Sequence, residues 1–127
     1  MGIALWLLEE AKRVAARHGA ERVEAVEVRV GELSGVEPSA LRFAFEAARA
    51  AVPLCEWAVL KVQWVPLRVR CSACGEEGAP APFSFACGTC ANPETAVVAG
   101  EELELVAVEI ETPTETAAAE GNGAGEG

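Results

Sequence analysis

Two pairs of closely spaced cysteines limit what this chain can fold into more than any other feature. The stretch CSAC contains Cys71 and Cys74, and the stretch CGTC contains Cys87 and Cys90. Each Cys-x-x-Cys turn directs two sulfur atoms toward one point, so two turns supply the four ligands of a tetrahedral ion. Four thiolates favour Zn²⁺, with an iron–sulfur cluster as the alternative. We therefore predict a structural zinc site that is closed by four protein ligands.

The cysteine pairs lie in a segment of distinct composition, 69–97, which is rich in Cys, Gly, Pro and Ala. A segment this short buries little apolar surface, so we expect its fold to depend on the bound metal. We predict a zinc-binding module over 69–97. A redox role for Cys71 and Cys74 is the alternative, because a single Cys-x-x-Cys pair is enough for that chemistry.

The rest of the chain alternates helical and strand patterns. Apolar residues recur every three or four positions over 3–18 and again over 38–48, which predicts two helices. Apolar and polar residues alternate over 23–31, 58–66 and 101–111, which predicts three strands. We therefore predict an α+β fold, with two helices packed on one face of a small three-stranded sheet.

This pattern also predicts how the chain divides into domains. The α/β domain is expected to span 1–68 and 98–112, with the module at 69–97 inserted before its last strand. Residues 113–127 are small, polar and acidic, so we predict a disordered acidic tail there.

Charge and hydropathy exclude several classes of partner and location. The formal net charge of the 127 residues is −10, which argues against binding to nucleic acid. No apolar run approaches the ~18 residues of a membrane-spanning helix. The first apolar run is short and lacks a basic residue before it, so it is not a signal peptide. We therefore expect a cytoplasmic protein, in which thiols stay reduced.

The other reactive side chains indicate no catalytic site. His18 is the one histidine, and its position near a helix end is explained by favourable charge there. Cys55 stands apart from the two pairs, and we predict a buried apolar thiol. No nucleophile–base set can be assembled from these residues, so we do not expect an enzyme.

Four stretches together resemble the HypA family of nickel-handling maturation proteins. They are RHGAERVEAVEVRVGELSGVEPSALRFAFEAA, CSACG, CGTC and GEELELVAVEIE. The resemblance covers about residues 1–111. It implies a nickel metallochaperone that carries Ni²⁺ on its α/β domain and holds Zn²⁺ in the cysteine module. The alternative is a zinc-ribbon interaction module, or a HypA paralogue that does not bind nickel.

The resemblance also implies the partners. A nickel-handling GTPase would assist delivery of nickel to the large subunit of [NiFe]-hydrogenase, and in some organisms to urease. The oligomeric state is left open, a homo-oligomer included.

The nickel ligands are where this chain departs from the family pattern. Family members begin Met-His-Glu, and that histidine is the main nickel ligand. When this chain is aligned with the family pattern, its Met1 falls three residues after the first Met of the family. Gly2 and Ile3 offer no side-chain ligand. Either an internal Met has been taken as the start, which we favour, or the chain is a paralogue without these ligands. The remaining nickel candidates are Glu37 and the amine of Met1, although for Glu37 we favour a role as a favourable charge at the start of the second helix.

Overall fold

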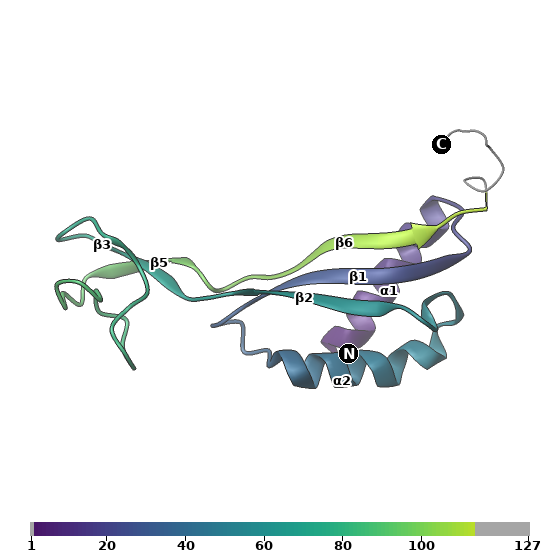
Figure 1. Ribbon diagram of the computed structural model, residues 1–127, viewed down its shortest axis with the longest axis horizontal. Coiled ribbons are helices and arrows are strands. Elements are labelled where there is room, and N and C mark those ends of the chain that lie inside the picture. Colours follow the sequence, from purple (N-terminus) through teal and green to yellow (C-terminus); the bar gives the residue numbers. More distant parts are fainter. Residues whose placement is uncertain (1, 114–127) are drawn as a thin grey trace. The chain divides into compact units, whose positions relative to one another are not determined.

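The computed structural model describes residues 2–113, which contain two α-helices, two short 3₁₀ helices and six strands (Figure 1). In chain order the elements are α1 (Ile3–Arg17), β1 (Arg22–Gly31), α2 (Pro38–Ala48), η1 (Arg49–Ala51), η2 (Pro53–Cys55), β2 (Val59–Val65), β3 (Arg68–Cys71), β4 (Glu77–Gly78), β5 (Thr95–Ala99) and β6 (Leu103–Glu111). The strands form two three-stranded sheets, ordered β2-β1-β6 and β4-β3-β5.

The described chain forms two compact units. Among the described residues, the first contains 2–28, Glu37–Lys61 and 105–113. The second contains Arg29–Val36 and Val62–Glu104. The predicted module at 69–97 therefore lies wholly within the second unit, and its assignment as a separate zinc domain stays a prediction.

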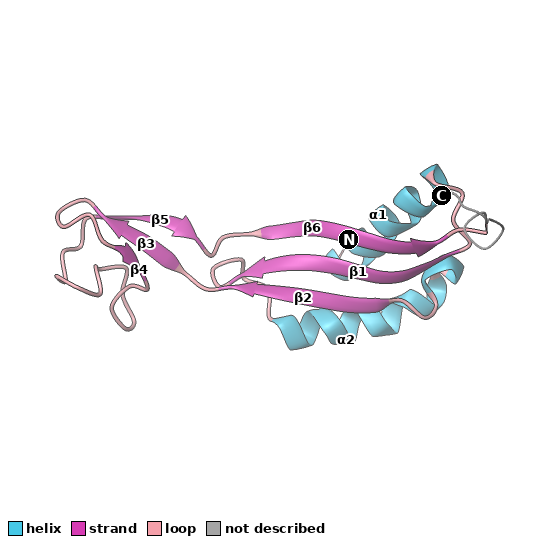
Figure 2. Cartoon of the chain, turned by 45° about the horizontal axis from the view of Figure 1, so that its top comes forward, coloured by secondary structure: helices cyan, strands magenta, loops and turns pink. Residues whose placement is uncertain are grey.

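The core of the first unit is built from the apolar faces of the two helices and from apolar side chains of the strands. Leu7 and Leu8 of α1 and Phe45 of α2 are fully buried, as are Val26 and Val28 of β1. Full burial of each such side chain stabilises the fold by about 1.5–3 kcal/mol. Figure 2 shows both helices along one face of the strands. The predicted α+β fold, with two helices on a three-stranded sheet, is confirmed.

Two arginines of the α2 region protect the outer strand of this sheet. The Arg42 guanidinium donates to the Leu60 carbonyl at 2.6 Å, and that of Arg49 donates to the Ala58 carbonyl at 2.6 Å. β2 is the edge strand of this sheet, and Ala58 directly precedes it. The two arginine side chains satisfy carbonyls at this edge, which hinders pairing with another chain there.

The second unit contains a sheet that the sequence pattern did not predict. β3 pairs in an antiparallel manner with both β4 and β5. In this register Arg70 lies opposite Glu77 and Cys71 lies opposite Thr95. Cys71 is the last residue of β3, so the first cysteine pair begins at the end of a strand.

The third predicted strand, 101–111, is present as β6, which begins at Leu103, two residues after the predicted start. Within residues 2–113, no helix is long and apolar enough to cross a membrane. The predicted acidic tail at 113–127 lies, apart from Pro113, outside the described residues.

Candidate metal centre

The first cysteine pair forms a tight turn at the end of β3. The Cys71 Sγ accepts the backbone N–H groups of Ala73 and Cys74, at 3.3 and 3.4 Å. The N–H of Gly75 donates to the Cys71 carbonyl at 3.0 Å. Gly75 has φ 77°, in the left-handed region that glycine adopts without steric cost. These bonds close the turn and direct its two sulfur atoms to one side.

The second pair repeats this geometry. The Cys87 Sγ accepts the N–H groups of Thr89 and Cys90, at 3.3 and 3.4 Å. The N–H of Ala91 donates to the Cys87 carbonyl at 2.9 Å. Ala91 has φ 65°, which is uncommon for a residue with a Cβ. The two turns, 71–75 and 87–91, are thus equivalent, and below we call each of them a knuckle.

The two knuckles bring all four sulfur atoms together, within 4.8 Å of one another. The Sγ atoms of Cys71 and Cys90 are 3.6 Å apart, and those of Cys74 and Cys87 are 3.7 Å apart. A tetrahedral ion with metal–sulfur bonds of about 2.3 Å requires sulfur–sulfur distances of about 3.8 Å. The cysteines form no disulfide. Both the donor atoms and their spacing therefore fit a tetrahedral thiophilic ion.

Backbone hydrogen bonds favour the thiolate form of the first cysteine in each knuckle. The N–H groups of Cys90 and Thr89 lower the pKa of Cys87 to about 6. Those of Cys74 and Ala73 lower the pKa of Cys71. The backbone thus shifts two of the four ligands toward the thiolate, which is the form that binds metal.

In the second cysteine of each knuckle, the pKa is shifted the other way, toward the protonated thiol. The N–H of Glu76 favours a Cys74 thiolate, but burial and the neighbouring sulfurs outweigh it and raise the pKa of Cys74 to about 12. The N–H of Asn92 acts in the same way on Cys90, yet the Cys71 sulfur and burial raise the pKa of Cys90. A bound cation would have to displace these two protons.

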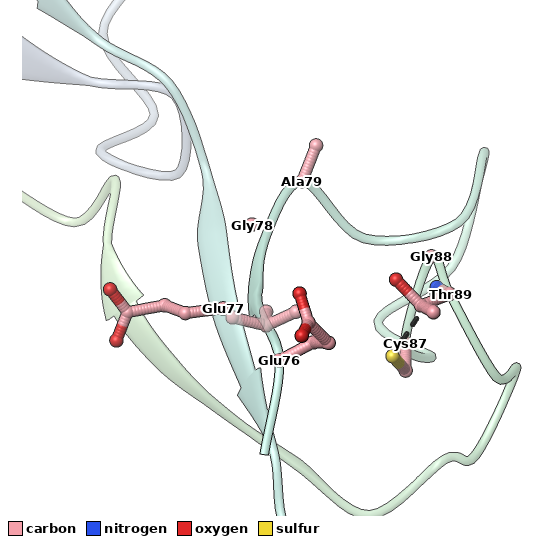
Figure 3. Close-up of a pocket in the computed structure, with 8 residues that line it drawn as sticks. Glu76, Glu77, Gly78, Ala79, Cys87, Gly88 and Thr89 are labelled. Carbon is pink, nitrogen blue, oxygen red and sulfur yellow. Dashed lines mark hydrogen bonds between the residues drawn. The ribbon is translucent and has the colours of Figure 1, made fainter. Parts of the chain in front are cut away.

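A small hollow of about 210 Å³ lies beside the second knuckle (Figure 3). Its lining includes the metal-site residue Cys87 together with Glu76 of the loop after the first knuckle. Glu76 and Glu77 extend to opposite sides of the chain in Figure 3, and Glu77 Oε2 accepts from Arg70 at 2.6 Å. The sequence pattern did not single out Glu76, because nothing in its spacing relates it to the cysteines.

The other predicted site residues are not part of this cluster. Glu37 lies in the first unit, where its Oε1 accepts the N–H of Ala40 at 2.9 Å and caps α2. Met1 lies outside the described residues. Within residues 2–113, the four cysteines are the one group of three or more metal-binding side chains.

The unassigned cysteine and histidine occupy the positions expected of them. Cys55 is fully buried, as predicted, and burial is the main cause that raises the pKa of its thiol. His18 is exposed at the C-cap of α1.

Comparison with known proteins identifies the family. The family model described as hydrogenase/urease nickel incorporation, metallochaperone, hypA matches residues 1–110. The hydrogenase maturation factor HypA of Nitrosospira multiformis is 39% identical over 103 residues, covering 81% of this chain and 89% of the relative. The HypA of Chloroflexus aggregans is 40% identical over 110 residues, covering 86% and 96%.

Solved structures support the fold. The solution structure of the nickel metallochaperone HypA from Helicobacter pylori aligns with a TM-score of 0.60 and 23% identity, covering 87% of this chain and 95% of that one. A second solution structure of a HypA protein aligns with a TM-score of 0.64 and 24% identity, covering 86% and 92%. These solved structures share the fold, and the family model and the sequence relatives show that the chain belongs to the HypA family of nickel metallochaperones.

Proposed function

We propose that this chain carries Ni²⁺ as cargo to a hydrogenase under assembly and that its four clustered cysteines hold a structural Zn²⁺. The convergence of four sulfur atoms within 4.8 Å is the observation that carries the zinc site. Membership of the HypA family supports the nickel role. The proposed activity is binding and transfer of a metal ion, without catalysis.

The zinc site is proposed to be structural because all four ligands come from the protein. Cys71 and Cys87 would contribute the thiolates that the backbone already favours, and Cys74 and Cys90 would complete the set. A bound Zn²⁺ supplies a cross-link between the two knuckles, and sites of this kind contribute about 10–16 kcal/mol to folding. The sheet β4-β3-β5 would therefore form only with the metal in place.

The nickel site is proposed to lie on the first unit. In this chain, its ligands would be the Met1 amine and the Glu37 carboxylate. A Met-His-Glu lead before the first helix, as the family resemblance implies, would add an imidazole. Nitrogen-rich coordination of that kind suits Ni²⁺ better than harder ions.

The test of the nickel role is a calorimetric titration of two zinc-loaded polypeptides. One is the 127-residue chain, and the other carries Met-His-Glu before its first helix. We expect weak nickel binding by the first and tight one-to-one binding by the second, because only the second has an imidazole beside an amino terminus. Equal affinities would contradict the proposed site.

The proposed partners are a nickel-handling GTPase and the hydrogenase large subunit, in the cytoplasm. The names of the relatives support hydrogenase, and the family description includes urease. We expect radioactive nickel to pass from the loaded chain to an immature hydrogenase large subunit more completely than to urease apoprotein. Equal transfer, or preference for urease, would correct the proposed target.

A zinc-ribbon interaction module without nickel is the second candidate function. The observation in its favour is that an oxygen of Glu37 is already used to cap α2. This candidate predicts that neither polypeptide in the titration binds nickel, while both contain zinc.

A further inference from the structure

The loop at residues 79–85, with the sequence APAPFSF, is an exposed apolar feature that the metal site does not explain. We call it the aromatic loop. Phe83 is fully exposed, at 108% of its reference area, and Phe85 is 52% exposed. Phe83 also has φ 57°, a strained conformation for a bulky residue. Strain of this kind persists where the surrounding structure enforces it and is concentrated at functional positions.

Hydrogen bonds hold the aromatic loop in place at its base. The N–H of Ala81 donates to the Ala86 carbonyl at 2.9 Å, and the N–H of Ala86 donates to the Ser84 hydroxyl at 2.7 Å. The Thr95 hydroxyl of β5 donates to the Phe85 carbonyl at 2.5 Å. The two phenylalanines are therefore presented to solvent by an ordered loop, which lowers the entropy cost of binding through them.

The aromatic loop borders a hollow of about 570 Å³. The hollow is lined by Glu32, Pro66 and Leu67 together with residues 79–85. All of these residues belong to the second unit. An apolar concavity with one polar group at its wall is the usual form of a binding site.

The charge around the hollow selects the kind of ligand. Glu32 is the one charged residue that lines it, and its Oε1 accepts the N–H of Leu67 at 2.7 Å. The second unit contains seven glutamates, three arginines and no lysine. Each arginine is engaged: Arg29 with Glu104, Arg70 with Glu77, and Arg68 with the Glu77 carbonyl. The unit therefore repels acidic segments and attracts cationic ones.

From this combination we infer that the hollow beside the aromatic loop docks an extended segment of a partner protein in which an apolar side chain neighbours a lysine or arginine. The apolar side chain fills the space between Leu67 and the loop, and the cation lies beside Glu32. This site contains no metal ligand. The inference goes beyond the proposed metal function and does not depend on which ion the chain carries.

The test uses the full zinc-loaded chain and fluorescent peptides as probes. The main probe alternates leucine with arginine, and two control peptides replace arginine by glutamate or leucine by serine. We expect fluorescence anisotropy to show binding of the leucine–arginine peptide, and much weaker binding of both controls. Chemical shift changes in amide spectra should fall on residues 79–85 and on Glu32 and Leu67.

Variants then separate the two parts of the site. F83A combined with F85A should weaken binding by roughly tenfold, the size of effect that exposed aromatic anchors produce at interfaces. E32Q keeps an oxygen for the Leu67 N–H but removes the charge, so it should weaken binding less and reduce its dependence on salt. F43A is the matched control, because Phe43 is 76% exposed on α2 in the other unit. If the double variant fails to fold, F83A alone replaces it in the binding measurement.

Several outcomes would overturn the inference. One is equal binding of the leucine–glutamate peptide or of the serine–arginine peptide, and another is an equal loss of affinity in F43A. Absence of binding by the leucine–arginine peptide would also overturn it. A dimer in sedimentation that F83A dissociates would show instead that a second copy of this chain fills the hollow.

Discussion

Gly75 and Ala91 occupy equivalent positions, each directly after a cysteine pair and each with positive φ, 77° and 65°. Their N–H groups donate to the Cys71 and Cys87 carbonyls at 3.0 and 2.9 Å. The left-handed conformation is free of steric cost for glycine and costs other residues about 1 kcal/mol. The second knuckle therefore carries strain that the first one lacks.

This relationship predicts opposite effects of two substitutions. A91G should stabilise the zinc-loaded protein by about 1 kcal/mol, and G75A should destabilise it by about the same amount. Space is not the cause at Gly75, because a Cβ there meets no atom within 4 Å. Competition with a chelator measures both effects, each about fivefold in zinc affinity. Effects of the same sign in the two variants would contradict the equivalence of the knuckles.

At Gly88 the prediction depends on the room for a Cβ atom, and not on the backbone angle φ. A Cβ at this position would lie 2.7 Å from the Ala79 carbonyl oxygen, so the backbone at the second knuckle would have to shift. We expect G88A to destabilise the zinc-loaded protein by about 1–3 kcal/mol. G78A is the matched control, since a Cβ at Gly78 meets nothing within 4 Å. Chemical denaturation should show a loss in G88A and little change in G78A; similar losses would rule out the close approach as the cause.

Two substitutions at Glu37 separate its capping role from its proposed nickel role. E37A removes the acceptor for the Ala40 N–H and should lower the free energy of unfolding by about 1 kcal/mol. E37N retains a good N-cap and should leave stability nearly unchanged. If the carboxylate binds nickel, calorimetry will show weaker nickel binding in both variants. Unchanged nickel affinity in E37N would assign Glu37 to the helix cap alone.

The pKa values of the cysteines predict how many protons zinc binding releases. With a pKa of about 6, Cys87 is mainly a thiolate at pH 7.5 and mainly a thiol at pH 5. Cys74, with its pKa raised to about 12, is protonated throughout this range. Lowering the pH from 7.5 to 5 should therefore increase proton release, with Cys87 alone adding about one proton per zinc ion. Calorimetry in buffers of different ionisation enthalpy measures this number. A release that does not change with pH would show that Cys87 has an ordinary pKa before the metal binds.

Local patterns in the sequence predicted much of the first unit. Alternation at Val26 and Val28 marked β1, and helical spacing of Leu7, Leu41 and Phe45 marked the buried faces of the two helices. Each of these signals extends over several residues, so the side-chain period is readable. The carboxylate expected at the start of α2 is that of Glu37, which caps the helix by accepting the Ala40 N–H.

The second unit was harder to predict because its structure depends on contacts distant in sequence. β3, β4 and β5 have four, two and five residues, too few for a readable alternation. Their pairing joins Cys71 to Thr95, and no local pattern specifies that partner. The cysteine spacing predicted the cluster, whereas the positive φ values of Ala91 and Phe83 follow from the folded loops and were not predicted.

The most direct test of the four-thiolate zinc site is the zinc content per chain in two single-cysteine variants. C90S removes one ligand of the cluster, and C55A removes the buried thiol that lies outside it. Inductively coupled plasma mass spectrometry should find one zinc ion per chain in the parent protein and in C55A, and loss of zinc in C90S. One zinc ion per chain in C90S, with an unchanged amide spectrum, would contradict the account.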